Sequence, residues 1–267
     1  MLYYLQNTSY TAAFFLYGTI NMQTVTAERT ELSSDKLSSS YRFAFVADLH
    51  FGSSQSMRTT AATIASIAAE DVDFVILGGD IVDIYTTREE MEETFALFGA
   101  MDAPVYFIYG NHDRQLDGES SARTFTEGEL EQAMRANGIE ILRDEWVRFS
   151  DELVIFGRED YSMETRRDIA GIEPRPSGAF VLLADHSPYE TDDIVASGAD
   201  LQLSGHTHAG QLFPLQWVYR LAGYDAYGFF RHGETLLYVS SGASGWAFPF
   251  RTEEGCHYEL VTLSPAA

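Results

Sequence analysis

Short apolar runs that each end in polar or ionisable side chains recur along the chain and constrain its fold most strongly. The first three lie at residues 43–47, 74–77 and 105–108, separated by 58–70 and 87–98, which have helical spacing. Continuous apolar runs are typical of strands buried on both faces. Strands that alternate with helices predict a mostly parallel sheet with right-handed crossovers.

The remaining elements extend this α/β pattern. Residues 127–137 and 190–197 are predicted to be helices, and 180–184, 200–204, 236–240 and 258–263 are predicted to be strands. Three shorter strands, 138–142, 146–149 and 153–156, form an antiparallel-looking stretch, whereas the aromatic segment 212–231 is loop-like. Because the sequence contains no internal repeat or low-complexity linker, we expect one domain at 41–267, preceded by an N-terminal region at 1–40.

The charge balance limits the partners of this domain. The chain has 267 residues, with 40 acidic and 17 basic side chains and a net charge of −23. Such a surface repels phosphate backbones and anionic lipid headgroups, so no nucleic acid partner is expected. The only cysteine, Cys256, cannot form an intrachain disulfide.

The N-terminal region begins with 27 residues that carry no charged side chain. Its apolar part, 10–17, is shorter than the roughly 20 residues of a membrane span, and no basic residues precede it as in a signal peptide. It fits a hydrophobic helix lying on the domain, the tail of a membrane span, or a weak interfacial anchor. Peripheral membrane association and a cytoplasmic location both stay open. Residues 22–32 alternate like an edge strand, and 33–40 form a polar connector.

Five of the seven histidines directly follow predicted strands, as do two aspartates and an asparagine. These residues are Asp48, His50, Asp80, Asn111, His112, His186, His206 and His208. The carboxyl ends of parallel strands meet at one edge of a sheet, where ligands bind. Nitrogen and oxygen ligands without cysteine suit Mn²⁺, Fe or Zn²⁺. Apart from His112, these residues are seven possible ligands, which are too many for one ion and fit two that share a carboxylate. Two such ions can hold the attacking and leaving oxygens of a phosphoryl transfer, with a shared water deprotonated as the nucleophile.

The motifs occur in an order that resembles the calcineurin-like metallophosphoesterase superfamily over residues 41–265. They are Asp48-Leu-His50, Gly79-Asp80-Ile-Val-Asp83, Gly110-Asn-His-Asp113, His186 and Gly205-His-Thr-His208. The extended segment 205–211 is similar to the bacterial YkuE-type phosphohydrolase branch, which usually has glycine at the position of Ala209. Members of this branch often carry an N-terminal membrane span. The resemblance implies a four-layer α/β/β/α sandwich, with two mixed sheets flanked by helices.

The resemblance also implies a role for each residue. One divalent ion would be held by Asp48, His50, Asp80 and His208, and the other by Asp80, Asn111, His186 and His206. His112 would stabilise the transition state or protonate the leaving oxygen, and Asp113 would orient His112. Asp83 and Gln211 fit supporting roles around these ligands, or exposed and capping roles equally well.

The implied activity is hydrolysis of a phosphodiester, phosphomonoester or pyrophosphate by a hydroxide that bridges two metal ions. The alternative is a catalytically silent metal-binding scaffold on the same fold; that every expected position is filled favours the enzyme. The aromatic side chains of 212–231 could stack on a sugar or base, receive an acyl chain, or simply close the sheet edge. We expect a small-molecule or lipid-linked phosphoester as the substrate, with a cell-envelope substrate as one option.

Overall fold

A computed structural model describes residues 2–114, 123–169, 172 and 178–266. The helices are α1 (Leu2–Gln23), α2 (Met57–Ala68), α3 (Arg88–Gly99), α4 (Glu127–Ala136), α5 (Thr191–Ser197) and α6 (Leu215–Leu221). The strands are β1 (Val25–Ser34), β2 (Tyr41–Val46), β3 (Phe74–Leu77), β4 (Val105–Phe107), β5 (Glu140–Ile141), β6 (Glu145–Arg148), β7 (Leu153–Gly157), β8 (Phe180–Ala184), β9 (Leu201–Ser204), β10 (Gly228–His232), β11 (Thr235–Val239) and β12 (Cys256–Pro265).

The strands form two mixed sheets of six. The first sheet has the order β1-β12-β2-β3-β4-β5, and the second has the order β10-β11-β9-β8-β7-β6. In the first sheet β2 to β5 are parallel, while β12 runs antiparallel to β2 and parallel to β1. In the second sheet β11, β9, β8 and β7 are parallel, and β10 and β6 are antiparallel edge strands. The apolar runs that predicted parallel strands therefore lie at the centres of the two sheets.

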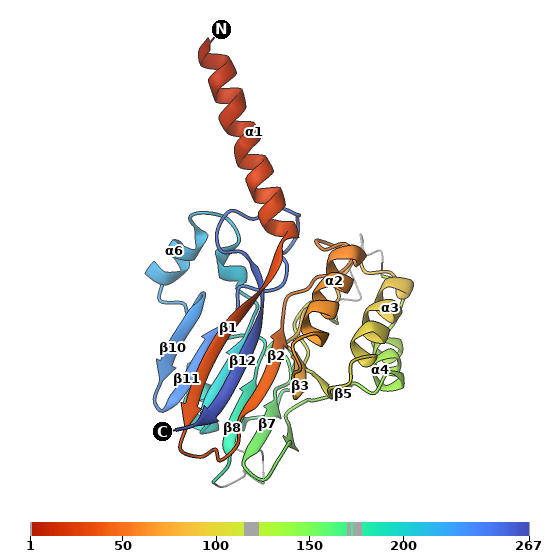
Figure 1. The fold of residues 1–267 in the computed structure, drawn as a ribbon, viewed down its shortest axis with the longest axis vertical. Coiled ribbons are helices and arrows are strands. Elements are labelled where there is room, and N and C mark those ends of the chain that lie inside the picture. Colours follow the sequence, from red (N-terminus) through yellow and green to blue (C-terminus); the bar gives the residue numbers. More distant parts are fainter. Residues whose placement is uncertain (1, 115–122, 170–171, 173–177, 267) are drawn as a thin grey trace.

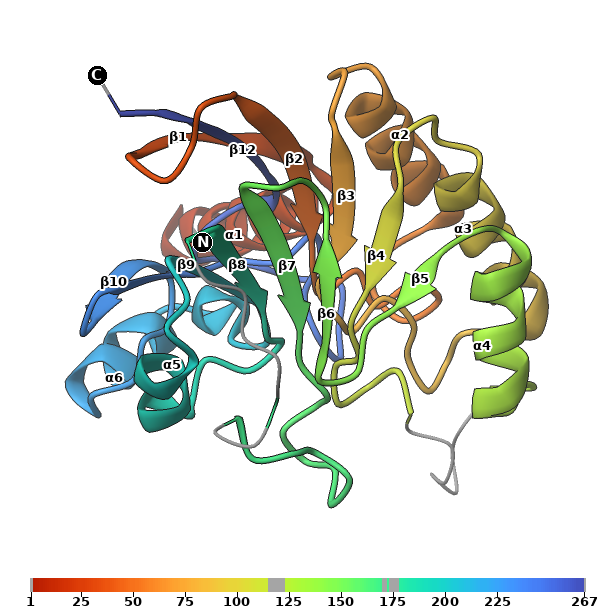
Figure 2. The same cartoon turned by 90° about the horizontal axis from the view of Figure 1, so that it is seen from below.

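The layers pack as the predicted four-layer sandwich. Helices α2, α3 and α4 cover the outer face of the first sheet (Figure 2), where Val46, Ile67 and Phe95 belong to one buried cluster. The inner faces of the two sheets form a second cluster, which includes Phe43 and Leu182. The outer face of the second sheet has a thinner cover, in which the short helix α5 packs Ile194 near β11. The α/β/β/α prediction is confirmed.

The starts of α3 and α4 follow from local side-chain chemistry. Thr87 accepts a hydrogen bond from the backbone of Glu90, whose carboxylate accepts one from the Thr87 amide in return. Thr126 and Glu129 form the same reciprocal pair at α4. Each pair satisfies two amides that a helix start otherwise leaves without partners. The capping pattern in the sequence therefore sets where α3 begins.

Two parts of the secondary-structure prediction are wrong. Residues 212–231 are not a loop, because they contain α6 and the edge strand β10, which pairs with β11. The stretch 138–156 is not one antiparallel unit, because β5 pairs in parallel with β4 while β6 pairs with β7 in the other sheet. Both errors arise because pairing partners distant in the sequence determine strand direction, which local patterns do not contain.

Helix α1 is longer than the apolar segment that predicted it, and it includes Met22 and Gln23, which the alternating pattern places in the edge strand. Figure 1 shows that it projects from the body of the molecule and meets it only at its C-terminal end. The expectation of a helix lying along the domain is therefore wrong for most of its length. Among the described helices, none combines the length and apolar character required to cross a membrane.

Candidate metal centre

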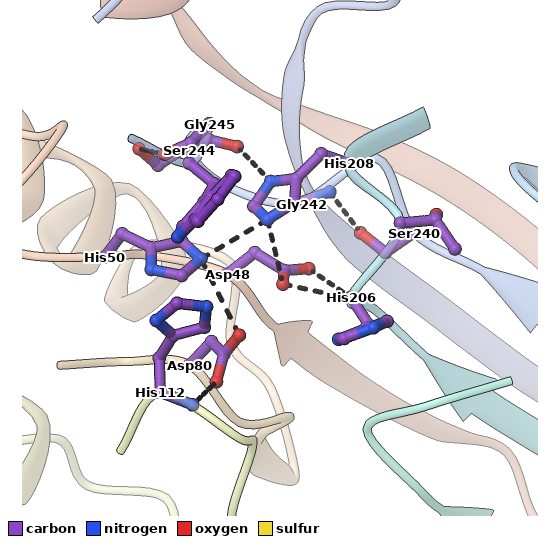
Figure 3. A network of polar contacts seen from close by, with 12 residues as sticks. Asp48, His50, Asp80, His112, His206, His208, Ser240, Gly242, Ser244 and Gly245 are labelled. Carbon is purple, nitrogen blue, oxygen red and sulfur yellow. Dashed lines mark hydrogen bonds and ion pairs between the residues drawn. The ribbon is translucent and has the colours of Figure 1, made fainter. Parts of the chain in front are cut away.

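The turns that follow β2, β3, β4, β8 and β9 converge at one edge of the sandwich. Asp48 and His50 follow β2, Asp80 follows β3, and His206 and His208 follow β9; Figure 3 shows all five around one small space. His186, which follows β8, places its Nε2 atom 3.1 Å from the carboxylate of Asp80. Asn111 follows β4, next to His112, whose amide donates to Asp80. The predicted ligands therefore gather from both sheets.

The backbone of this edge adopts conformations that side chains normally avoid. Five predicted ligands have positive φ angles: Asp48 (54°), His50 (42°), Asp80 (53°), His206 (72°) and His208 (50°). Each such conformation in a non-glycine residue costs on the order of 1–3 kcal/mol and persists only where surrounding contacts impose it. Here the amides of Asp48 and His50 donate to the carbonyls of Gly79 and Asp80, so the two turns hold each other.

The first group of ligand atoms belongs to Asp48, His50 and His208, all buried. The Nε2 atoms of the two histidines lie 3.3 Å apart, and Nε2 of His208 lies 3.6 Å from Oδ1 of Asp48. Atoms that share one ion at about 2.1 Å lie roughly 3.0–3.4 Å apart in octahedral or tetrahedral geometry. The 3.3 Å separation lies within this range and the 3.6 Å separation slightly above it, so a small movement of the Asp48 carboxylate would let the three atoms share one divalent ion. Nε2 of His50 is also 3.7 Å from Asp80, so this carboxylate adjoins the group.

The second group consists of Asp80, His186 and His206. Beside it, the side-chain oxygen of Asn111 is buried and has no hydrogen-bond partner among the described residues. A buried amide oxygen without a partner is costly, and a metal ion is one group that would satisfy it. The donor set fits a second divalent ion, with Asp80 lying between the two groups.

Three of the histidine rings are oriented by partners of Nδ1, the ring nitrogen that points away from the cluster. Nδ1 of His50 lies 2.9 Å from the carboxylate of Asp83, that of His186 lies 2.8 Å from the carbonyl of Gly78, and that of His208 lies 3.2 Å from the carbonyl of Ser244. These groups are acceptors only, so Nδ1 carries the proton in each ring. Nε2 of each ring therefore faces the cluster and would offer its lone pair to a bound ion, as in metal sites whose histidines have carboxylate or carbonyl partners.

The buried carboxylates of the cluster favour binding of positive charge. Burial raises the pKa of Asp48, with the nearby Asp80 carboxylate as a further contribution. Burial acts in the same direction on Asp80, but the charge and hydrogen bond of His186 outweigh it and lower the Asp80 pKa well below its usual range. Burial lowers the pKa of His206 to about 4. Two buried carboxylates side by side are thus offset only by protonated histidines, and bound cations would replace those protons.

A family model described as calcineurin-like phosphoesterase matches residues 41–210. The chain belongs to the calcineurin-like phosphoesterase family. An uncharacterised metallophosphoesterase of Helicobacter pylori is 28% identical over 84% of this chain and 60% of its own length. The uncharacterised metallophosphoesterase YkuE of Bacillus subtilis is 25% identical over 79% of this chain and 74% of its own length. The expected superfamily and branch are confirmed, although the chain spans only about 60% of the Helicobacter relative.

The fold has a counterpart among solved structures. The crystal structure of TT1561 of Thermus thermophilus aligns with a TM-score of 0.50 and 8% identity, covering 76% of this chain and 89% of that one. At this identity the likeness concerns the fold alone, and it agrees with the two-sheet sandwich described above.

Within the phosphoesterase site, Asp113 lies differently from expectation. Its two carboxylate oxygens accept the backbone amides of Asp80, Ile81, Val82 and Gly110. It therefore holds the turn after β3 against the turn after β4. Asp83 faces His112 instead, with Oδ1 of Asp83 3.4 Å from Nδ1 of the ring. The local motif could not separate these two aspartates, because their roles depend on how the turn after β3 folds back.

Two further residues support the site. Gln211 donates its amide to the carbonyls of Trp246, Phe248 and Phe250 and so fixes the loop beside the metal-binding edge. Arg251, buried next to His208, was missed by the sequence analysis. An isolated arginine that follows Phe248-Pro-Phe250 carries no local signal for such a position.

Proposed function

We propose that the chain is a metal-dependent phosphohydrolase with two divalent ions that share Asp80. The observation that carries this proposal is the convergence of buried carboxylates and histidine Nε2 atoms, together with the oxygen of Asn111 that lacks a partner in the described part of the chain. When bound, two adjacent divalent ions supply positive charge to the attacking and leaving oxygens of phosphoryl transfer and lower the pKa of water. The metal identity, Mn²⁺, Zn²⁺ or Fe, stays open.

His112 is the residue best placed to move a proton. Its ring lies at the edge of the cluster, 5.0 Å from the ring of His50 between centroids, and its side chain is partly exposed to the neighbouring groove. Its amide is fixed by Asp80, and the carboxylate of Asp83 lies beside Nδ1. In our proposal the ring donates a proton to the leaving oxygen. Such general acid catalysis typically contributes about 10²–10⁴-fold to the rate.

The test measures metal content and hydrolysis of p-nitrophenyl phosphate and bis-p-nitrophenyl phosphate on the same Mn²⁺-reconstituted samples. We expect Asp80→Ala to lose bound metal, and His112→Ala to keep it while losing about 10²-fold or more in kcat. His232→Ala is the matched control, because His232 is a partly buried histidine paired with Asp225 outside the site. Full turnover by His112→Ala would refute the role of His112. A wild type that binds two ions but hydrolyses neither compound would support the scaffold alternative.

The substrate class is suggested by a groove of about 410 Å³ next to the cluster. Its lining includes the polar side chains of Asp80, His112, His206 and His208 and the apolar or aromatic side chains of Leu212, Leu215, Tyr219, Trp246 and Phe248. Trp246 and Phe248 are 51% and 45% exposed, so the apolar part opens to the surface. We infer a phosphoester whose non-reacting part is apolar, such as a lipid-linked phosphate.

Paired substrates with the same leaving group and short or long acyl chains test this substrate class. We expect Trp246→Ala to raise KM for the long-chain member and leave KM for the short one unchanged. Equal hydrolysis of short and long members by the wild type would rule out the apolar subsite.

Peripheral membrane association through α1 is a further part of the proposal. Its described side chains include the exposed Tyr10, Phe14, Phe15, Leu16, Tyr17 and Ile20. The first charged residue of the chain is Glu28, so α1 has no charged face that favours water. Because the net charge of −23 repels anionic headgroups, we expect binding to phosphatidylcholine vesicles. Phe14→Ser with Phe15→Ser should abolish co-flotation; unchanged co-flotation would refute this role of α1.

A further inference from the structure

Arg251 is a fully buried cation held without an ion pair in the described part of the chain. The other fully buried arginine, Arg158, pairs with the carboxylates of Asp144 and Asp193. The guanidinium of Arg251 donates instead to four backbone carbonyls, those of His208 (2.7 Å), Ser241 (2.7 Å), Ser244 (2.8 Å) and Glu254 (2.5 Å), and to Sγ of Cys256 (3.8 Å). Burying a charge without an ion pair costs free energy of folding. The position of Arg251 is therefore not explained by stability alone.

The hydrogen bonds of Arg251 converge on one predicted metal ligand, His208. Nη2 binds the carbonyl of His208 itself, and Nη1 binds the carbonyl of Ser244. The Ser244 carbonyl is also the acceptor for Nδ1 of the His208 ring. Ser244 and the ring of His208 lie together in Figure 3. One guanidinium therefore fixes both the backbone and the ring partner of a histidine whose own φ angle is 50°.

A third hydrogen bond extends this control to Asp48. Arg251 binds the carbonyl of Ser241, and the next residue, Gly242, packs against Asp48 so closely that a Cβ would lie 2.7 Å from that of Asp48. Asp48 and His208 are two members of the first ligand group. The contacts of Arg251 therefore reach this group from two directions, whereas the acceptors of its guanidinium include no residue of the second group.

The backbone of Arg251 is hydrogen-bonded to the C-terminal end of α1. Its amide donates to the carbonyl of Gly18, and the side-chain amide of Asn21 donates to the Arg251 carbonyl. Gly18 is required for this contact, because a Cβ there would lie 2.3 Å from the ring of Phe250. The segment that fixes His208 is thus held from outside by the end of the N-terminal helix.

We propose that Arg251 is a positioning residue for the metal ion bound by Asp48, His50 and His208, acting through the His208 and Ser244 carbonyls. The inference rests on the proposed two-ion site. Loss of the guanidinium frees the His208 turn and its ring partner together, while Asn111 and His186, which follow β4 and β8, keep their contacts. The ion of the second group therefore stays bound, and the expected defect is selective.

The experiment titrates metal-free full-length protein with Mn²⁺ by calorimetry and counts the ions retained after gel filtration. Wild type should retain two ions. Arg251→Met, which approximates the length of the side chain without its charge, should bind one ion with unchanged affinity and the other about 10–100-fold more weakly. Arg251→Lys keeps the charge but cannot reach four carbonyls, so it should show a smaller loss at the same ion.

Two controls separate positioning from general destabilisation. Leu130→Ala removes a buried side chain of α4, in the cluster between the helices and the first sheet, and should lower thermal stability while both ions bind normally. In Arg251→Ala, guanidinium chloride added at a non-denaturing concentration should restore binding of the weakened ion if the cation itself positions His208. If Arg251→Met cannot be purified folded, Arg251→Lys and guanidinium rescue decide the question.

Each outcome supports or overturns the inference. Two ions bound with wild-type affinity by Arg251→Met or Arg251→Lys would overturn the role of Arg251. Equal weakening of both ions, or similar weakening in Leu130→Ala, would assign Arg251 a structural role only. A wild type that binds no Mn²⁺, Zn²⁺ or Fe²⁺ would instead refute the proposed function and this inference with it.

Discussion

Replacing Glu259 by glutamine should change how the free energy of unfolding depends on pH. Glu259 lies on β12 with no exposed surface, and only one of its carboxylate oxygens has a close partner, the hydroxyl of Ser240 at 2.7 Å. The other oxygen has no partner among the described residues. Burial therefore raises the Glu259 pKa well above its usual value, and the nearby carboxylate of Glu28 raises it further.

The sign and size of the effect follow from proton linkage. Because the folded-state pKa lies above the unfolded-state value, the folded protein binds the extra proton. The stability that this proton contributes is fully present below the unfolded pKa and is lost as pH rises toward the folded pKa. One such group changes the free energy of unfolding by about 1.4 kcal/mol per pH unit within that window. For a domain of this size that corresponds to roughly 3–6 °C in Tm per pH unit.

The assay is urea unfolding of the chelator-treated wild type and Glu259→Gln at half-unit steps across roughly pH 5–8. In this range a buried carboxyl with a raised pKa is protonated in the folded protein and ionised in the unfolded protein. The glutamine amide adds a buried donor and hence a constant penalty of about 1–3 kcal/mol, so the slope of the difference is the readout. We expect the variant to gain stability relative to wild type as pH rises. Glu31→Gln, an exposed glutamate on neighbouring β1, is the control and should show no slope. A pH-independent difference for Glu259→Gln would refute the reasoning.

Three other changes test the site and the packing. Gly205→Ala would place a Cβ 2.4 Å from Oδ2 of Asp48, so Mn²⁺ affinity measured by calorimetry should fall about 10–100-fold, and wild-type affinity would contradict this. Phe95→Ala should lower the free energy of unfolding in urea by about 3–5 kcal/mol, because Phe95 is fully buried between α3 and the first sheet. A loss below about 1 kcal/mol would contradict this and would mean that neighbouring side chains fill the cavity. Thr126→Ala removes the cap of α4 and should cost about 1 kcal/mol, with no change expected in metal content.

The parallel strands and their polar ends could be predicted because each depends on a short stretch of sequence. Phe43 to Ala47 is apolar without interruption, as a strand buried on both faces must be, and Asp48 follows directly. The same holds for Phe74 to Leu77, which Asp80 follows after two glycines. Since parallel strands end at the same edge, local patterns were sufficient to place these ligands together.

The interactions behind the ligands could not be predicted, because they join segments distant in the sequence. Whether Asp83 or Asp113 faces His112 depends on how the turn after β3 folds. The carboxylate of Asp113 already accepts hydrogen bonds from four backbone amides, so Asp83 lies beside His112 instead. Arg251 reaches His208 across two strands that separate them in the chain. The segment 212–231 has the pattern of a loop because its aromatic side chains follow no clear period, although β11 pairs with part of it.

The position of β12 between β1 and β2 has a consequence for biosynthesis. Strand β12 is second in the spatial order of the first sheet but is synthesised after its other strands. Strand β1 therefore has no neighbour in that sheet until residues 256–265 have left the ribosome. The carbonyl of Met22 at the end of α1 accepts from the side-chain amide of Gln55 and gains its second donor, the thiol of Cys256, only with β12. Until then β2 presents an open edge next to Asp48, which is a hazard for aggregation during translation. The arrival of β12 thus places β1 in the first sheet and covers the open edge of β2 in one late step.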